Sequence, residues 1–281
     1  MEFVTITNST NPRTNELLSA ACQQRKISYR ELDADRHSTT ELPPLAPGTL
    51  LYRVATGIRP ATMERMLLRS NIVTLYRDPL YLRNDRYATL TLFHAGIPMP
   101  RTIFSPLRQS IDADVRYLGG YPVIIKIIGG SHGIGVLRAD SRESLLSFMD
   151  YLDQEEMYYI LRSYIHVPNS ARLIVLGAQV IDSIEYQVPE GDFRSNVGEA
   201  PKVQPKKFDA TLERSAVAAV QALGLEFGGV DILYDTQSHY VVEVNFPCYF
   251  GRAQDATGFN TAGAVIDYLK AKAEKNGYLE T

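Results

Sequence analysis

The fold is decided by one stretch, Gly228-Gly-Val-Asp-Ile-Leu-Tyr-Asp-Thr-Gln-Ser-His-Tyr-Val-Val-Glu-Val-Asn245. It holds two apolar runs around a polar, turn-like segment, a pattern that predicts a β-hairpin. Pairing Tyr234 with Tyr240 across the turn places Asp231 directly opposite Glu243. Two carboxylates that face each other on neighbouring strands repel, unless a cation lies between them.

Asn245 lies on the same face as Glu243, because residues two apart on a strand point to the same side. Asp231, Glu243 and Asn245 therefore form a predicted set of oxygen ligands. Such a set suits Mg²⁺, which usually also takes waters and substrate phosphates. The hairpin thus predicts nucleotide chemistry, with Mn²⁺ as the alternative metal.

Composition sets limits on the class of protein. The chain has 281 residues, 45% of them hydrophobic, enough for one large core or two to three smaller ones. A net charge of −3 predicts no bulk attraction to nucleic acid or to an anionic membrane. The only cysteines, Cys22 and Cys248, exclude a disulfide framework, and no stretch has the features of a signal peptide or membrane span. We expect a cytoplasmic protein.

The order of expected elements indicates three subdomains. Alternating strand-like and helix-like segments in residues 1–83 predict a small parallel α/β domain, including a helix from Pro60 to Arg69 and a strand from Ile72 to Leu75. Residues 84–163 and 164–281 predict two antiparallel sheets with helices. In the middle part, Asp140 and Glu143 are expected to form the capping box of a helix.

A second motif, Pro122-Val-Ile-Ile-Lys-Ile-Ile-Gly-Gly-Ser-His-Gly-Ile-Gly135, places a lysine in an apolar strand and four glycines just after it. Bare backbone N–H groups in such a loop can approach phosphate oxygens. The loop is not a P-loop, and its glycines precede a strand, unlike those of a dinucleotide fingerprint. Lys126 is costly to bury unpaired, so a nucleotide phosphate is its expected partner; a lysine that snorkels from an edge strand is the alternative.

The order of these motifs resembles that of ATP-grasp ligases of the RimK-like (ribosomal-protein glutamate ligase) type. The matching pieces are Val123-Ile-Ile-Lys126, Arg172, Gly191-Asp-Phe-Arg-Ser-Asn196, Gly229-Val-Asp-Ile232 and Glu243-Val-Asn245. The resemblance covers roughly Asn84 to Leu269. It implies an ATP-grasp fold of the α/β (α+β) class, in which two antiparallel subdomains clasp ATP beside the N-terminal domain.

The family uses ATP to join a carboxylate to an amine. The γ-phosphate passes to the carboxylate, and the amine attacks the acyl phosphate, which requires Mg²⁺, stabilising cations and exclusion of water. By resemblance, Asp231, Glu243 and Asn245 hold one or two Mg²⁺ ions, and the γ-phosphate and acyl oxyanion are lined by Arg172, Arg194 and Asn196. The implied ATP contacts are Arg86, Lys126, Gly129, Gly130, Ser131, His132, Gly133, Gly135, Arg162, Ser163, Tyr164 and Ile165.

Several positions depart from the family pattern. Arg86 stands where a lysine is usual, Ser163 replaces a hinge acid, and Ser170 replaces an Asp near the ribose, which leaves nucleotide preference open. The stretch Glu243-Val-Asn-Phe-Pro-Cys-Tyr-Phe-Gly251 differs from the common Glu-Val-Asn-x-Ser-Pro-Gly, so the acceptor need not be glutamate or a ribosomal protein. Its aromatic residues, Tyr249 among them, are predicted to line the acceptor pocket or to pack in the core.

Arg53 is the predicted carboxylate-binding residue, because it ends an apolar strand at the carboxyl edge of the parallel sheet. On the residues alone, Arg194 beside Asp192 is equally a solvated ion pair, and Arg172 an exposed strand arginine. Cys248 is a nucleophile or, more simply, a small buried hydrophobe.

Three functions stay open. The first is an ADP-forming ligase of small-molecule or peptide carboxylates and amines. The second is a small-molecule kinase on the same scaffold, and the third a non-catalytic nucleotide-binding module. The oligomeric state is open as well, although the family often forms dimers or tetramers.

Overall fold

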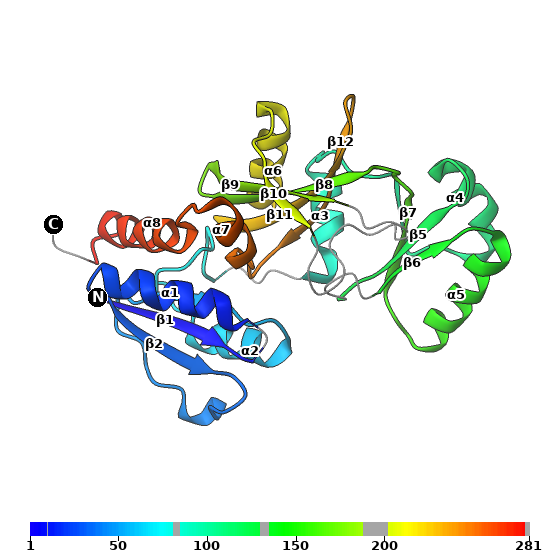
Figure 1. Ribbon diagram of the computed structural model, residues 1–281. Helices are drawn as coiled ribbons and strands as arrows, with labels where there is room; N and C mark the ends of the chain where they lie inside the picture. Colours follow the sequence, from blue (N-terminus) through cyan, green and yellow to red (C-terminus); the bar gives the residue numbers. More distant parts are fainter. Residues whose placement is uncertain (10, 81–84, 130–134, 188–201, 279–281) are drawn as a thin grey trace.

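The computed structural model describes residues 1–9, 11–80, 85–129, 135–187 and 202–278 (Figure 1). Within these ranges the chain forms three sheets, one parallel and two antiparallel. This arrangement confirms the predicted mixed α/β class with an N-terminal parallel sheet followed by two antiparallel ones. Over the same ranges, each helix is too short or too polar to pass through a lipid bilayer.

The N-terminal sheet has the strand order β2-β1-β3, and all its strand pairs are parallel. Its strands are β1 (Glu2–Thr7), β2 (Ser28–Asp33) and β3 (Leu50–Arg53), joined by helix α1 (Pro12–Gln24) and the 3-10 turn η1 (Thr39–Glu41). Helix α2 (Ile58–Leu67) follows β3, close to its predicted position. The predicted strand from Ile72 to Leu75 is wrong in extent, because only Val73 pairs, through an isolated bridge to Leu50.

The central sheet is antiparallel with the order β4-β7-β5-β6. Its strands are β4 (Thr102–Phe104), β5 (Val123–Ile127), β6 (Val136–Ala139) and β7 (Tyr159–Ser163). The helical segments of this part of the chain are η2 (Asp85–Tyr87), α3 (Ala88–His94), η3 (Arg108–Ser110), α4 (Ile111–Leu118) and α5 (Arg142–Gln154). Helix α3 also contacts α6 of the C-terminal part.

The N-cap of helix α5 lies one residue later than predicted, at Ser141 instead of Asp140. Ser141 is the N-cap, and its hydroxyl accepts from the N–H of Ser144, whose own hydroxyl accepts from the N–H of Ser141. The predicted box of Asp140 and Glu143 is therefore wrong. Asp140 instead accepts a hydrogen bond from Arg138 at 2.8 Å.

The C-terminal sheet is antiparallel with the order β10-β9-β8-β11-β12. Its strands are β8 (Asn169–Leu176), β9 (Gln179–Gln187), β10 (Val203–Pro205), β11 (Phe227–Tyr234) and β12 (His239–Asn245). Helices α6 (Ala210–Ala222), α7 (Gly251–Thr257) and α8 (Thr261–Lys275) accompany it, and α8 lies alongside α1 of the N-terminal domain (Figure 1).

The N-terminal and C-terminal sheets share one hydrophobic core, whereas the central sheet has a core of its own. Tyr52 of β3 lies at the junction, with its ring edge-on to Phe227 and Phe246 at centroid distances of 5.8 and 5.9 Å. Lys272 of α8 donates to the carbonyl of Tyr76 at 2.7 Å, which ties the same two parts together.

Candidate active site

The hairpin of β11 and β12 brings Asp231 opposite Glu243, as predicted, but by a different register near the turn. Tyr234 pairs with His239 rather than with Tyr240, and the register shifts between Asp231 and Ile232. Val242 is the extra residue on β12. A β-bulge of this kind changes the direction of nearby side chains. The extra residue of the bulged strand has no pairing partner on the opposite strand. The bulge restores the facing pair of carboxylates.

Asp231 is held by two side chains. Arg172, its neighbour on β8, donates from Nε and Nη2 to the two carboxylate oxygens, each at 2.7 Å. Asn245 donates from Nδ2 to Oδ2 of Asp231 at 3.0 Å. Burial alone would lower the pKa of Arg172, but Asp231 raises it well above its ordinary value. Arg172 is thus a permanently charged, bidentate partner of Asp231 and not an exposed strand arginine.

Glu243 is held from another subdomain. Lys126 of β5, in the central sheet, donates from Nζ to Oε2 of Glu243 at 2.6 Å. Burial acts to raise the pKa of Glu243, but Lys126, and at longer range Arg172 and Arg162, hold it below its ordinary value. The lysine that the sequence placed in an apolar strand therefore lies 14% exposed, with a carboxylate as its partner.

Arg162 of β7 enters the same region, since Lys126 pairs with Ile160 and residues two apart share a face. Its Nη1 donates to the carbonyl of Val242, the bulge residue, at 2.9 Å. Its Nε and Nη2 are buried and have no hydrogen-bond partner in the described part of the chain. Burial lowers the pKa of Arg162 to about 10, against the opposing effect of Glu243. Buried, unpaired donors are uncommon in folded proteins and mark a position where an acceptor belongs.

Small residues leave room for this cluster. A Cβ on Gly229 would lie 3.0 Å from Sγ of Cys248 and 3.8 Å from the Arg172 side chain. Burial raises the pKa of Cys248 to about 12, so its thiol is protonated at neutral pH. Of the two interpretations of Cys248, the structure therefore favours a small buried hydrophobic residue over a nucleophile. Its backbone N–H donates to Tyr52 Oη at 2.9 Å.

Arg53, the predicted carboxylate-binding residue, lies buried at the end of β3. Its guanidinium is buried, with Nε 2.8 Å from Oε2 of Glu64 and Nη1 donating to the carbonyl of Ala55 at 2.8 Å. Tyr76 donates to the same Glu64 oxygen at 2.8 Å. The charge of Arg53 balances a buried glutamate of α2, which the sequence pattern did not show to be buried. This geometry engages Arg53 within the core, and its contact with a carboxylate substrate stays a prediction.

The remaining predicted contacts are placed as follows. Tyr249 donates to Thr56 Oγ1 at 3.2 Å and is half-buried, whereas its neighbours Phe246 and Phe250 are buried in the core. Tyr164 lies under the guanidinium of Arg138, 4.9 Å from the ring centroid. The predicted ATP contacts Arg86, Gly129, Gly135, Ser163 and Ile165 lie within the described residues, and their contact with ATP stays a prediction. Outside the described residues lie Gly130, Ser131, His132, Gly133, Arg194 and Asn196.

Tyr186 of β9 was missed by the sequence reasoning. Its ring centroid lies 6.0 Å from the guanidinium carbon of Arg172. Electrostatic interaction with Tyr186 also contributes to the raised pKa of Arg172. No local pattern identifies it, because its position beside Arg172 depends on the β8–β9 pairing.

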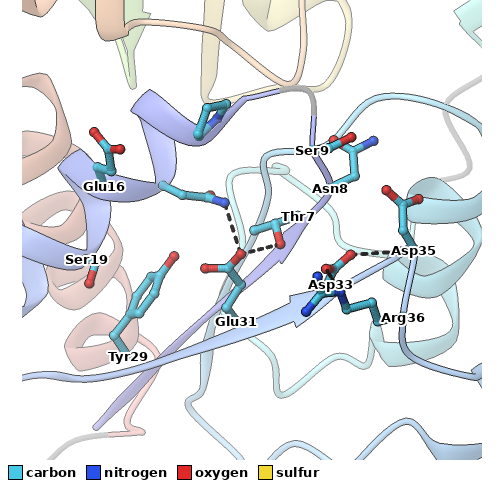
Figure 2. A pocket seen from close by; sticks show the side chains of 12 residues that line it. Thr7, Asn8, Ser9, Glu16, Ser19, Tyr29, Glu31, Asp33, Asp35 and Arg36 are labelled. Carbon is cyan, nitrogen blue, oxygen red and sulfur yellow. Dashed lines mark hydrogen bonds and ion pairs between the residues drawn. The ribbon is translucent and has the colours of Figure 1, made fainter.

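A separate pocket of about 650 Å³ lies at the carboxyl ends of β1 and β2 (Figure 2). Its lining includes the acids Glu16, Glu31, Asp33 and Asp35, together with Arg36. Asp33 forms an ion pair with Arg36 at 3.4 Å. The parallel-sheet edge thus carries a hollow, as expected for this fold, but its acidic lining does not favour a carboxylate ligand.

The sequence matches the model of a known family. Residues 83–269, more than half of the chain, match the family model described as RimK-like ATP-grasp domain. The chain belongs to this family. A probable alpha-L-glutamate ligase of Legionella pneumophila is 26% identical over 260 residues, covering 92% of this chain and 84% of the relative.

Solved structures of the fold agree. The ATP-grasp ligase PsnB, solved with a phosphomimetic variant of its minimal precursor, Mg and ADP, superposes with a TM-score of 0.74 at 15% identity, covering 96% of this chain and 98% of PsnB. A D-alanine–D-alanine ligase from Bacillus anthracis superposes with a TM-score of 0.70 at 14% identity, covering 98% of each chain. The chain is an ATP-dependent carboxylate–amine ligase.

Proposed function

We propose that this ligase activates a small-molecule or peptide carboxylate as an acyl phosphate at the Asp231–Glu243 hairpin and passes the acyl group to an amine. The γ-phosphoryl group of ATP moves to a carboxylate oxygen, and ADP leaves. The amine nitrogen then bonds to the acyl carbon, the acyl–oxygen bond breaks, and inorganic phosphate and a proton are released.

The supporting observation is the convergence of opposite charges from two subdomains. Three cations, Lys126 and Arg162 of the central sheet and Arg172 of the C-terminal sheet, gather around the facing carboxylates of β11 and β12. Such a preorganised set of donors is what stabilises the charge of a transferring phosphoryl group. A purely structural hairpin would gain little from facing acids on neighbouring strands, since their separation from water is costly.

The metal-ligand set fits Mg²⁺. Asp231, Glu243 and Asn245 offer hard oxygen ligands on one face of the hairpin. Across the described ranges, no three His, Cys, Asp or Glu side chains cluster, and the amide oxygen of Asn245 is proposed as the third protein ligand. Mg²⁺ held there would neutralise phosphate oxygens during transfer. One ion or two, and Mn²⁺ as a substitute, remain predictions.

The proposed roles of Arg172, Lys126 and Arg162 follow from the sheet on which each side chain lies. Arg172, with a planar fork beside Asp231, is proposed to stabilise the γ-phosphoryl group and the acyl oxyanion. Lys126 and Arg162, both on the central sheet, are proposed to contact the nucleotide. Arg194, Asn196 and the glycine loop remain predictions for the same site.

The substrates are proposed from the relatives. The similar curated proteins are named alpha-L-glutamate ligases, and PsnB was solved with a precursor peptide. An amino acid or a peptide terminus is therefore the class to test first, with Tyr249 at the acceptor side. A homo-oligomer and a cytoplasmic location also remain predictions.

The test incubates the protein with ATP, Mg²⁺, hydroxylamine and a pool of amino acids and peptides, followed by mass spectrometry of the products. Carboxylate-dependent hydroxamate, formed together with ADP, is the expected result, because hydroxylamine intercepts an acyl phosphate. A stable phosphorylated product would favour the kinase, and no turnover the binding module. Asp231→Asn is the inactive control. Lys270→Met, at an exposed ion pair with Glu274 within α8, is the active one.

A further inference from the structure

The ion pair between Lys126 and Glu243 differs from the pair between Arg172 and Asp231. Arg172 and Asp231 are joined by two bonds within one sheet, and their side chains are 13% and 15% exposed. Lys126 and Glu243 are joined by one bond across two subdomains, and Glu243 is 39% exposed. The first pair is therefore rigidly held, whereas the second can separate when its partners find other ligands.

Lys126 and a metal ion compete for the negative charge of Glu243. Mg²⁺ takes carboxylate ligands at about 2.0–2.1 Å in near-octahedral geometry. An ammonium group 2.6 Å from Oε2 already uses that oxygen as an acceptor and neutralises the carboxylate that would attract the ion. Its positive charge also repels the ion through a short distance that salt screens little.

We propose that Lys126 is the internal counter-ion of Glu243, which it holds until nucleotide phosphates attract the lysine and leave the carboxylate to the metal. The proposal rests on the metal site of the proposed function. It makes nucleotide binding and metal binding mutually dependent, because each removes one partner of the same ion pair. By thermodynamic linkage the two ligands must then strengthen each other's binding by the same factor.

Arg162 keeps the subdomains in register during this exchange. Its bond to the carbonyl of Val242 joins the central sheet to β12 at the residue next to Glu243. This bond does not involve the carboxylate, so it need not break when Lys126 leaves. The exchange therefore changes the charge around Glu243 without removing the contact between β7 and β12.

The experiment measures Mn²⁺ binding by electron paramagnetic resonance and Mg²⁺ binding by calorimetry, without nucleotide and with ADP. Lys126→Met should bind Mn²⁺ about tenfold more tightly than the wild type without nucleotide, and should bind ADP more weakly. In the wild type, ADP should tighten Mn²⁺ binding by about tenfold, and this coupling should be largely lost in Lys126→Met. Lys126→Arg keeps the charge and should keep the weak nucleotide-free binding.

Controls separate the possible failures. Lys270→Met removes the cation of an exposed ion pair with Glu274 within α8 and should leave metal binding unchanged. If Glu243→Gln leaves Mn²⁺ binding in the presence of ADP unchanged, the metal site of the proposed function is wrong. If Glu243→Gln weakens that binding but folded Lys126→Met, checked by circular dichroism, does not tighten nucleotide-free binding, the metal site stands and the counter-ion role is refuted. Should Lys126→Met not fold, loss of ADP coupling in Lys126→Arg decides against the proposal, and its retention supports it.

Discussion

Arg162→Met should make the nucleotide-free protein more stable while it weakens nucleotide binding. Arg162 is 3% exposed. Of its three guanidinium nitrogens, only Nη1 donates a hydrogen bond within the described residues, to the carbonyl of Val242. A side chain kept for the fold alone would have its donors paired. We therefore expect its removal to relieve the fold and to harm the ligand site.

The magnitude follows from the pKa of Arg162, which burial lowers to about 10. Each pH unit of lowering corresponds to about 1.4 kcal/mol, so the native state is disfavoured by about 3 kcal/mol at pH 7 for holding this charge. Loss of the charged hydrogen bond to Val242 offsets about 1.5–2 kcal/mol of that relief. The net expectation is a variant more stable by about 1–1.5 kcal/mol, in line with buried charges that are replaced by apolar side chains of similar size.

The assay is guanidinium chloride unfolding followed by circular dichroism at pH 7, paired with calorimetry of ADP in the presence of Mg²⁺. The unfolding midpoint should rise, and ADP affinity should fall by about tenfold, about 1.4 kcal/mol. Since the folded pKa of Arg162 lies below the unfolded one, the penalty is complete below about pH 10 and is relieved progressively as the pH rises from there to the unfolded pKa. The advantage of the variant should therefore shrink in strong alkali.

Arg13→Met is the matched control, because Arg13 pairs with Asp255 on the exposed surface. It should change neither the unfolding midpoint nor ADP affinity by much. The reasoning is refuted if Arg162→Met is clearly less stable than the wild type and binds ADP equally well. That result would make Arg162 a structural arginine.

Three further outcomes are expected. Asp231→Asn should abolish ligation and raise the apparent dissociation constant of Mn²⁺ in the presence of ADP, because one anionic ligand is lost; full activity in a coupled ADP assay would contradict the metal assignment. Cys248, with its pKa raised to about 12, should resist iodoacetamide at pH 8 in the native protein and react only after unfolding, as measured by mass spectrometry; rapid native labelling would count against its burial. Burial acts to raise the pKa of Glu185, but hydrogen bonds from Lys206, Tyr234 and Gln204 lower it below its ordinary value. The stability that Glu185 contributes should therefore be complete above the unfolded carboxylate pKa and be lost as the pH falls through the folded one. Glu185→Gln should then flatten the loss of melting temperature below pH 4.5, and an unchanged acid profile would contradict this sign.

Several features of the site could be predicted because their signals are local. Alternating apolar residues on both sides of a turn indicate the hairpin of β11 and β12, and period two puts Asp231, Glu243 and Asn245 on one face. The register at the turn was mispredicted by one residue, because a bulge at Val242 depends on neighbouring strands and leaves no mark in the sequence.

Side-chain partners were harder to predict than elements. Ser141 and Asp140 are both good caps, and the choice between them depends on backbone geometry and on the pull of Arg138 on Asp140. Arg53 ends an apolar strand in either interpretation, but its carboxylate turned out to be Glu64, eleven residues further along and buried by the packing of α2.

The sequence by itself determined the class of sheet, the facing carboxylates, the lysine in an apolar strand and membership of the family, because each depends on residues close together or on their order. Tertiary structure decided which charged side chains form ion pairs with each other. Lys126 and Glu243 are 117 residues apart and meet only because two separate sheets approach each other. Charge pairing acts through space and not along the chain, so the same residues carry no record of it until the chain is folded.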